Sequence, residues 1–230
     1  MKAMVLAAGR GERMRPITDR IPKPLVPIAG KPLIGYHLES LARAGIRDVV
    51  INLSYRGEQI REALMDGSGF GVRIEYSDEG PAAFETGGGI FNALPLLGPG
   101  PFLVVNGDVW TDFDFATLAL DPGVHARLVF VPNPPHVAGG DFGLEGEFVI
   151  KAERDRYTYS GIGVFSPEFF AGCTPGKFPL RPLLERAIAA RRLRGQVYRG
   201  DWSDIGSPER LADLEKRLQS SPSVGVGATV

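Results

Sequence analysis

Ala3-Met-Val-Leu-Ala-Ala-Gly-Arg-Gly11 decides the fold, because it joins an apolar run to a glycine-rich loop. The run Ala3–Ala7 predicts a buried strand, and Gly9 and Gly11 follow it directly. Glycine lets the backbone turn tightly and approach a phosphate chain closely. In a doubly wound sheet, ligands bind beyond the carboxyl ends of the strands. The stretch therefore predicts a phosphate-binding loop at a sheet edge, although glycines in a first loop can also serve a tight turn alone.

Strand and helix patterns alternate along the chain from this point. The expected helices are Pro32–Ala44, Glu58–Met65 and Gly87–Leu97, and the expected strands are Asp48–Leu53, Val72–Tyr76 and Phe102–Val105. Strands then dominate, at Leu128–Val131, Gly143–Ile150 and Tyr157–Phe165, before two helices at Leu180–Arg192 and Ser207–Leu218. Such alternation is typical of parallel sheets. We expect an α/β fold with a doubly wound, mostly parallel, Rossmann-like mixed sheet.

The composition fits one domain, expected over residues 1–218, with a disordered tail at 219–230. Of the 230 residues, 43% are apolar, which is enough for a sizeable core. The net charge of -1 gives no reason to expect a nucleic acid or an anionic membrane as a partner. A lone cysteine, the lack of a secretion signal and the lack of an apolar run of ~20 residues favour a cytoplasmic protein.

A lysine between two prolines is the second chemical signal. In Ile21-Pro-Lys-Pro-Leu25, the prolines fix φ and bias the residue before each of them toward extended backbone. Lys23 is therefore held on a stiff loop, close in sequence to the glycine-rich loop. The alternative is a proline-rich turn whose lysine stem covers apolar surface.

Two aspartates are candidates for a metal site. Asp108 ends Val104-Val-Asn-Gly-Asp108, where a buried strand stops, and Asp204 lies in Asp201-Trp-Ser-Asp-Ile-Gly-Ser207, before a capped helix. A carboxylate at the end of a buried strand costs free energy unless it is paired or binds a metal. Mg²⁺ takes one or two carboxylates together with substrate phosphates. The alternative for both residues is a turn or cap carboxylate.

Residues 6–25, LAAGRGERMRPITDRIPKPL, resemble the signature of the sugar-1-phosphate nucleotidylyltransferases, which is Leu-Ala-Ala-Gly-x-Gly-x-Arg followed by Pro-Lys. The resemblance implies a fold of the nucleotide-diphospho-sugar transferase type, with the loop around the phosphates of a nucleoside triphosphate. It implies that Arg13 and Lys23 are catalytic. The implied nucleotide-binding residues are Ala8, Gly9, Gly11, Glu12, Glu79, Thr86 and Gly87. Glu12 departs from the usual Thr or Ser of the family.

The same resemblance implies a metal site and a sugar site. Asp108 and Asp204 match the family aspartates that bind Mg²⁺. Asn106 and Asp141 resemble residues on the sugar side. The family's Glu-Lys-Pro, whose lysine meets the sugar phosphate, is absent, and Lys151 lies near its place in the sequence.

Within the family, the whole chain most resembles the short bacterial N-acetylmuramate-1-phosphate uridylyltransferases of cell-wall recycling. This implies transfer of UMP from UTP to N-acetylmuramic acid 1-phosphate, with release of pyrophosphate. The lactyl carboxylate of that sugar needs a donor, for which His136 and Lys151 are candidates.

Four other activities are alternatives to this one. An ionised Glu79 only accepts hydrogen bonds, so it selects uracil or guanine without separating them. Mannose-1-phosphate guanylyl transfer and a glucose-1-phosphate specificity therefore stay open. Met14 replaces the third fingerprint glycine of a Rossmann oxidoreductase, which argues against that class. Retention of Lys23, Asp108 and Asp204 together argues against a non-catalytic nucleotide-sugar sensor.

Overall fold

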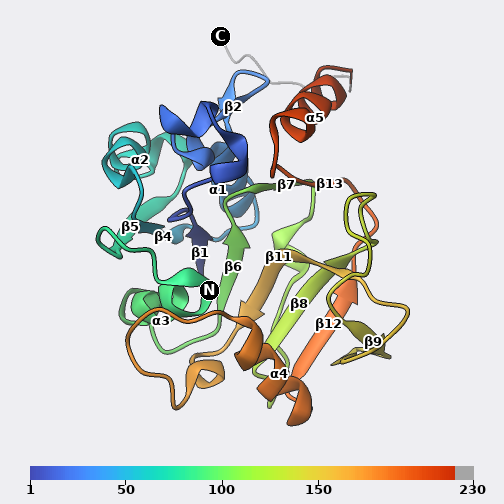
Figure 1. Ribbon diagram of the computed structural model, residues 1–230. Helices are drawn as coiled ribbons and strands as arrows, with labels where there is room; N and C mark the ends of the chain where they lie inside the picture. The colour runs from blue at the N-terminus through green and yellow to red at the C-terminus, as the bar shows by residue number, and fades with distance from the viewer. Residues whose placement is uncertain (221–230) are drawn as a thin grey trace.

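One nine-stranded sheet runs through the molecule in the computed structural model, which describes residues 1–220 (Figure 1). The strand order is β5-β4-β1-β6-β11-β8-β12-β10-β9. In that order the strands span Arg73–Asp78, Asp48–Leu53, Lys2–Leu6, Phe102–Asn106, Thr158–Phe165, Ala126–Val131, Leu193–Val197, Phe148–Ile150 and Gly143–Glu145. β5, β4, β1 and β6 are parallel, whereas β11 is antiparallel to both β6 and β8. The predicted doubly wound, mixed sheet is confirmed.

Helices cover both faces of this sheet because side chains alternate along each strand. In β1, Ala3 and Val5 pack against one apolar cluster and Met4 packs against the other. The first cluster takes in α1 (Leu33–Arg43) and α2 (Gly57–Leu64), and the second takes in α3 (Glu85–Leu97) and α4 (Arg181–Ala189) (Figure 1). The elements predicted in the first half of the chain are therefore confirmed to within a few residues.

The second half contains elements that the sequence did not predict. The expected strand Gly143–Ile150 is two strands, β9 and β10, and the expected helix Leu180–Arg192 stops at Ala189, before β12. A small separate sheet pairs β7 (Val109–Thr111) with β13 (Trp202–Asp204). The last helix, α5 (Pro208–Ser220), runs two residues past the expected domain end, and the rest of the predicted tail lies outside the described residues.

The remaining elements are short. They are the paired strands β2 (Pro27–Ile28) and β3 (Lys31–Pro32) and the 3₁₀ helices η1 (Glu12–Met14), η2 (Ile17–Asp19), η3 (Lys23–Leu25), η4 (Ser68–Phe70), η5 (Phe115–Thr117) and η6 (Pro167–Phe170). Among the helices formed by residues 1–220, none is both long and apolar enough to cross a membrane.

A buried histidine links α1 to β7. His37 is 2% exposed, and its Nε2 lies 2.7 Å from the carbonyl oxygen of Val109, so Nε2 carries the hydrogen and donates it. Burial lowers the pKa of His37 from 6.5 to about 4. His37 therefore has a structural role between α1 and β7.

The stability of the protein should therefore fall as the pH drops from about 6.5 to about 4. Between these pH values the unfolded chain binds a proton at His37, whereas the folded chain keeps the ring neutral. The contribution of the neutral ring to the free energy of unfolding is therefore complete above pH 6.5 and is lost as the pH falls to about 4. The expected loss is roughly 3 kcal/mol. Urea unfolding at several pH values should show a shallower pH dependence for His37→Gln, which retains an N–H donor. His125→Gln, at a partly exposed histidine, should keep the wild-type slope; equal slopes in wild type and His37→Gln would contradict the assignment.

Candidate active site

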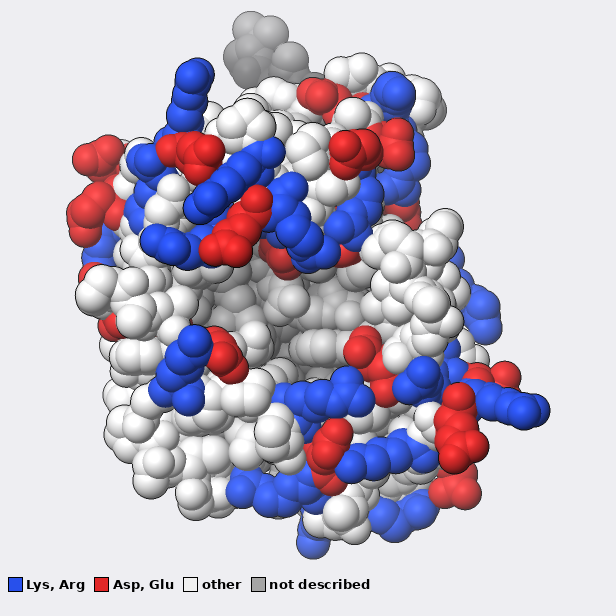
Figure 2. Space-filling model, viewed as in Figure 1, with Lys and Arg blue, Asp and Glu red and all other residues white. Residues whose placement is uncertain are grey.

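A cavity of about 590 Å³ opens at the carboxyl ends of β1 and β6. Its wall combines residues 6–14 after β1, residues 106–108 after β6 and the start of α3, and it also includes Lys23, Glu79 and Gly206. Figure 2 shows a hollow on this face with Lys and Arg side chains gathered above it. The cavity is thus where a doubly wound sheet places a ligand.

The loop after β1 needs glycine for a steric reason. Gly11 has a φ of 64°, and a Cβ added to it would lie 2.9 Å from Cγ2 of Thr18 and 3.2 Å from Cβ of Lys23. Met14 is fully buried, in a cluster with Ile28 and other apolar side chains. Met14 therefore anchors the loop and leaves its neighbour Arg13 in the cavity wall.

Lys23 is the most informative residue of the wall. It is 8% exposed, and its Nζ lies 2.6 Å from Oδ2 of Asp108. The 3₁₀ turn η3 begins at this lysine, between Pro22 and Pro24. Burial of an ammonium group is costly unless a charged partner meets it, and Asp108 is that partner.

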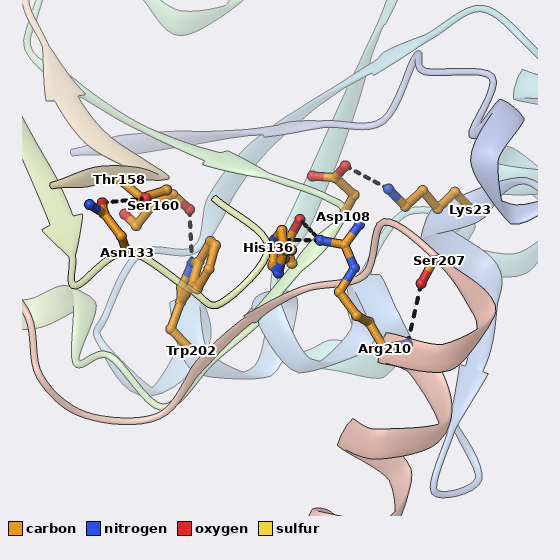
Figure 3. Close-up of polar contacts among 10 residues, drawn as sticks. Lys23, Asp108, Asn133, His136, Thr158, Ser160, Trp202, Ser207 and Arg210 are labelled. Carbon is orange, nitrogen blue, oxygen red and sulfur yellow. Dashed lines mark hydrogen bonds and ion pairs between the residues drawn. The ribbon is translucent and has the colours of Figure 1, made fainter. Parts of the chain in front are cut away.

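The small sheet brings the second aspartate beside the first. Asp204 pairs with Val109 in register, and the backbone N–H of Ile205 donates to the carbonyl oxygen of Asp108 over 2.8 Å. The Asp204 carboxylate accepts from Nη1 of Arg210 at 2.5 Å and lies 3.1 Å from Nε2 of His136. Figure 3 shows this group next to the Lys23–Asp108 pair. Residues 1–220 contain no cluster of three His, Cys, Asp or Glu side chains that could bind a metal alone.

A buried hydrogen-bond chain orders another side of the cavity. Asn52 accepts from the backbone N–H of Ala7 at 2.7 Å and donates to Oε1 of Glu79 at 2.6 Å. Oε2 of Glu79 accepts from the backbone N–H of Phe84 at 2.6 Å. Glu79 is 5% exposed and lines the cavity, so its carboxylate is fixed in direction before any ligand arrives.

Asn106 lies at the junction with β11. The strand has an irregularity between Tyr159 and Ile162, where Gly161 has a φ of 80°. A Cβ at Gly161 would lie 2.7 Å from the side chain of Asn106. The missing side chain therefore leaves room for Asn106 in the cavity wall.

Most of the predicted site residues meet in this cavity. The wall contains Ala8, Gly9, Gly11, Glu12, Arg13, Lys23, Glu79, Thr86, Asn106 and Asp108. Gly87, Asp141, Lys151 and Asp204 do not line it.

Gly87, Asp141 and Lys151 make other contacts in the structure, and their predicted ligand roles stay predictions. A Cβ at Gly87 would lie 2.7 Å from the ring of Phe178, so the missing side chain makes room for this ring. Asp141 accepts from the backbone N–H of Tyr159 at 2.8 Å and orders the β11 edge. Lys151 is exposed and pairs with Glu185 at 2.8 Å, because its backbone follows β10 at the far side of the sheet.

Three further residues in or beside the cavity were not indicated by the sequence. Asn52 is the penultimate residue of the buried strand β4, and a polar residue there was the available signal. Glu85 lines the cavity with a φ of 59°, which no sequence pattern reveals. Arg210 lies in the first turn of the predicted helix, where an arginine is unremarkable on sequence alone.

Similarity to known proteins shows the family of this chain. The family model for nucleotidyl transferases matches residues 2–134, which is more than half of the chain. The chain belongs to the nucleotidyl transferase family.

Two relatives that this nucleotidyl transferase covers almost end to end carry the same name. An N-acetylmuramate alpha-1-phosphate uridylyltransferase of Neisseria meningitidis is 48% identical over 224 residues, covering 94% of this chain and 97% of the relative. A protein of the same name from Caulobacter vibrioides is 36% identical, covering 94% and 96%. A Bacillus anthracis structure, provisionally assigned as a glucose-1-phosphate thymidylyltransferase and solved with sucrose, has a TM-score of 0.84 at 20% identity, covering 98% of this chain and 97% of its own. That structure supports the fold alone.

Asn52→Ala should lower the free energy of unfolding of this nucleotidyl transferase by about 2–4 kcal/mol, because the Ala7 N–H and the Glu79 carboxylate both lose a buried partner. Urea unfolding at neutral pH measures the change. Asn92→Ala is the matched control: Asn92 is exposed and donates to Ser77 over 3.0 Å, so its loss should cost well under ~1 kcal/mol. Similar losses in the two variants would show that the chain through Asn52 is not a stabilising network.

Proposed function

We propose that this nucleotidyl transferase transfers UMP from UTP to N-acetylmuramic acid 1-phosphate, giving a UDP-sugar and pyrophosphate. The observation that carries the proposal is the ion pair between the buried Lys23 and the partly exposed Asp108, in a cavity at the carboxyl ends of β1 and β6. The choice of UTP and of the muramate sugar is supported by the two full-length relatives with that name.

Arg13 and Lys23 act on the phosphates in this proposal. Both line the cavity, and they flank the loop whose glycines admit a phosphate chain closely. The phosphate of the sugar attacks the α-phosphorus of UTP in line, and it needs no general base because it is already an anion. The two cations offset the negative charge that builds up on the phosphoryl group and on the leaving pyrophosphate. Positioning of the two substrates contributes the rest of the rate enhancement.

The carboxylates fit a divalent metal, for which we propose Mg²⁺. Each already meets a cation of the chain, Lys23 on Asp108 and Arg210 on Asp204, which indicates that both places attract positive charge. Two carboxylates without a third protein ligand suit an ion that takes its other ligands from phosphates and water. When bound, such an ion supplies positive charge between the two phosphate groups.

Glu79 is the proposed base-selecting residue. Its two oxygens each accept one hydrogen bond, from Asn52 and from Phe84, which leaves lone pairs for one more donor. The N3–H of uracil is such a donor, whereas the corresponding nitrogens of adenine and cytosine are acceptors. Thr86 and Glu85, also in the wall, frame this side of the cavity.

Asn106 is the proposed contact on the sugar side. For the lactyl carboxylate, His136 and Lys151 both stay candidate donors: neither lines the cavity, His136 contacts Asp204 and Arg210, and Lys151 is paired with Glu185. We also propose a cytoplasmic location, which a UTP substrate would support.

A guanylyl transfer to mannose 1-phosphate is the second candidate, because Glu79 accepts equally well from guanine. A mannose-1-phosphate guanylyltransferase of Mycobacterium tuberculosis is 41% identical over 245 residues, covering 96% of this chain and 67% of its own length.

Turnover with a substrate panel separates the two candidates. Pyrophosphate release with Mg²⁺ should give the highest kcat/KM for N-acetylmuramic acid 1-phosphate with UTP, compared with glucosamine, glucose and mannose 1-phosphates and with GTP and ATP. A preference of ten-fold or more for mannose 1-phosphate with GTP, about 1.4 kcal/mol in transition-state binding, would replace uridylyl transfer by guanylyl transfer.

Lys23→Ala should lower kcat/KM by ~10²–10³ because one cation facing the reacting phosphates is lost. Steady-state kinetics measures this effect, and circular dichroism at the assay temperature checks that the variant is folded. Lys31→Ala is the control, since Lys31 pairs with Glu39 at 2.5 Å and does not line the cavity. Near-wild-type turnover of folded Lys23→Ala would remove Lys23 from the catalytic set.

A further inference from the structure

Arg210 joins three segments at the cavity. It lies in the first turn of α5, and its Nη1 lies 2.5 Å from Oδ2 of Asp204 and 2.6 Å from Nε2 of His136 (Figure 3). His136 comes from the loop between β8 and β9, and Asp204 ends β13. The Arg210 side chain is only 20% exposed, so the guanidinium group is held in place rather than free in solvent.

The guanidinium groups of Arg210 and Arg13 both lie close to Gly206 in the cavity wall. Gly206 lines the cavity, and a Cβ added there would clash with the guanidinium of Arg210 and lie 3.3 Å from Nη2 of Arg13. The missing side chain at Gly206 therefore lets two arginines approach the same point of the wall. Arg13 belongs to the glycine-rich loop, so this is the side of the cavity that faces the nucleotide phosphates in the proposed function.

Both carboxylates proposed for the metal are neutralised by cations of the chain. Asp108 has Lys23 and Asp204 has Arg210. A divalent ion that binds Asp204 competes with Arg210 for the same oxygens. An arginine released from Asp204 beside Arg13 has the planar fork of donors that suits a phosphate.

His136 gives the released arginine a second anchor. For the 2.6 Å contact to be a hydrogen bond, Nε2 of His136 must be the acceptor, because an arginine nitrogen always carries hydrogens; the same Nε2 also lies 3.1 Å from Oδ1 of Asp204. This acceptor is still present when the Asp204 carboxylate binds another cation. The guanidinium is therefore tethered near Gly206 in both situations.

We propose that Arg210 has two roles, as the cation that pairs with Asp204 in the free enzyme and as a ligand of the leaving group. When the divalent ion binds Asp204, Arg210 is released from this carboxylate. It then binds the pyrophosphate portion of the nucleotide together with Arg13. The inference rests on the proposed function only in requiring nucleotidyl transfer, because pyrophosphate is released whichever base and sugar are used. Removal of the Arg210 side chain should therefore strengthen binding of the metal and weaken binding of pyrophosphate.

Metal binding to the nucleotide-free protein tests the first half. Titration with Mn²⁺, followed by electron paramagnetic resonance, should show Arg210→Ala binding the ion about three- to ten-fold more tightly than wild type, because a competing cation is gone. Arg210→Lys retains a positive charge and should stay close to wild type. Arg217→Ala is the matched control: it removes an arginine–aspartate pair, with Asp201, from the same helix and should leave Mn²⁺ affinity unchanged.

Pyrophosphate binding tests the second half. Calorimetric titration of pyrophosphate in the presence of Mg²⁺ should give a Kd roughly ten-fold higher for Arg210→Ala than for wild type or Arg217→Ala. Thermal unfolding checks the fold of each variant, and Arg210→Gln, which keeps amide donors toward Asp204 and His136, replaces the alanine variant if that one is unstable.

Two results would overturn the inference: Mn²⁺ affinity in the charge-removing variant equal to or weaker than in wild type, or an unchanged Kd for pyrophosphate. Failure of the proposed function would look different. Wild-type protein would then give no turnover with any nucleoside triphosphate and sugar 1-phosphate of the panel, whereas both binding experiments require neither the sugar nor the base.

Discussion

The ion pair between Lys23 and Asp108 is the interaction on which the rest of the site depends. It ties the loop after β1 to the end of β6, two strands that are already neighbours in the sheet. A lysine that is 8% exposed is stable there only with the carboxylate 2.6 Å away. The pair thus fixes the wall of the cavity and also leaves the carboxylate with a cation that a ligand complex must displace or share.

Asp204 is also paired with a cation, but different elements of the fold bring the two groups together. Asp108 follows a strand of the main sheet, whereas Asp204 arrives on β13, which pairs only with β7. The α5 helix then supplies Arg210, and the β8–β9 loop supplies His136. Lys23 and Arg210 are therefore each paired with a carboxylate before anionic substrates bind, which lowers the cost of keeping these cations close together.

The sequence was informative where local pattern and burial agree. The strands β1, β4 and β6 are continuous apolar runs, so their position and the cavity beyond their ends followed directly. By contrast, β7 and β13 have three residues each, and β12 reads Leu-Arg-Gly-Gln-Val, so their existence depends on pairing with distant strands. The prediction for Lys151 rested on closeness to a missing motif along the chain, which does not show that β10 lies near the β9 edge of the sheet, away from β1 and β6.

The glycine run at the start of α3 shows how packing and ligand recognition are combined. Gly87 makes room for Phe178, and a Cβ at Gly88 would clash with the carbonyl oxygen of Gly176. At Gly89, an added Cβ would lie 2.5 Å from Oε1 of Glu79. The absent side chain at Gly89 therefore lets the helix lie directly against the carboxylate that Asn52 and Phe84 orient. The glycines of α3 thus allow close packing, and their effect on the proposed base site is the direction in which Glu79 points.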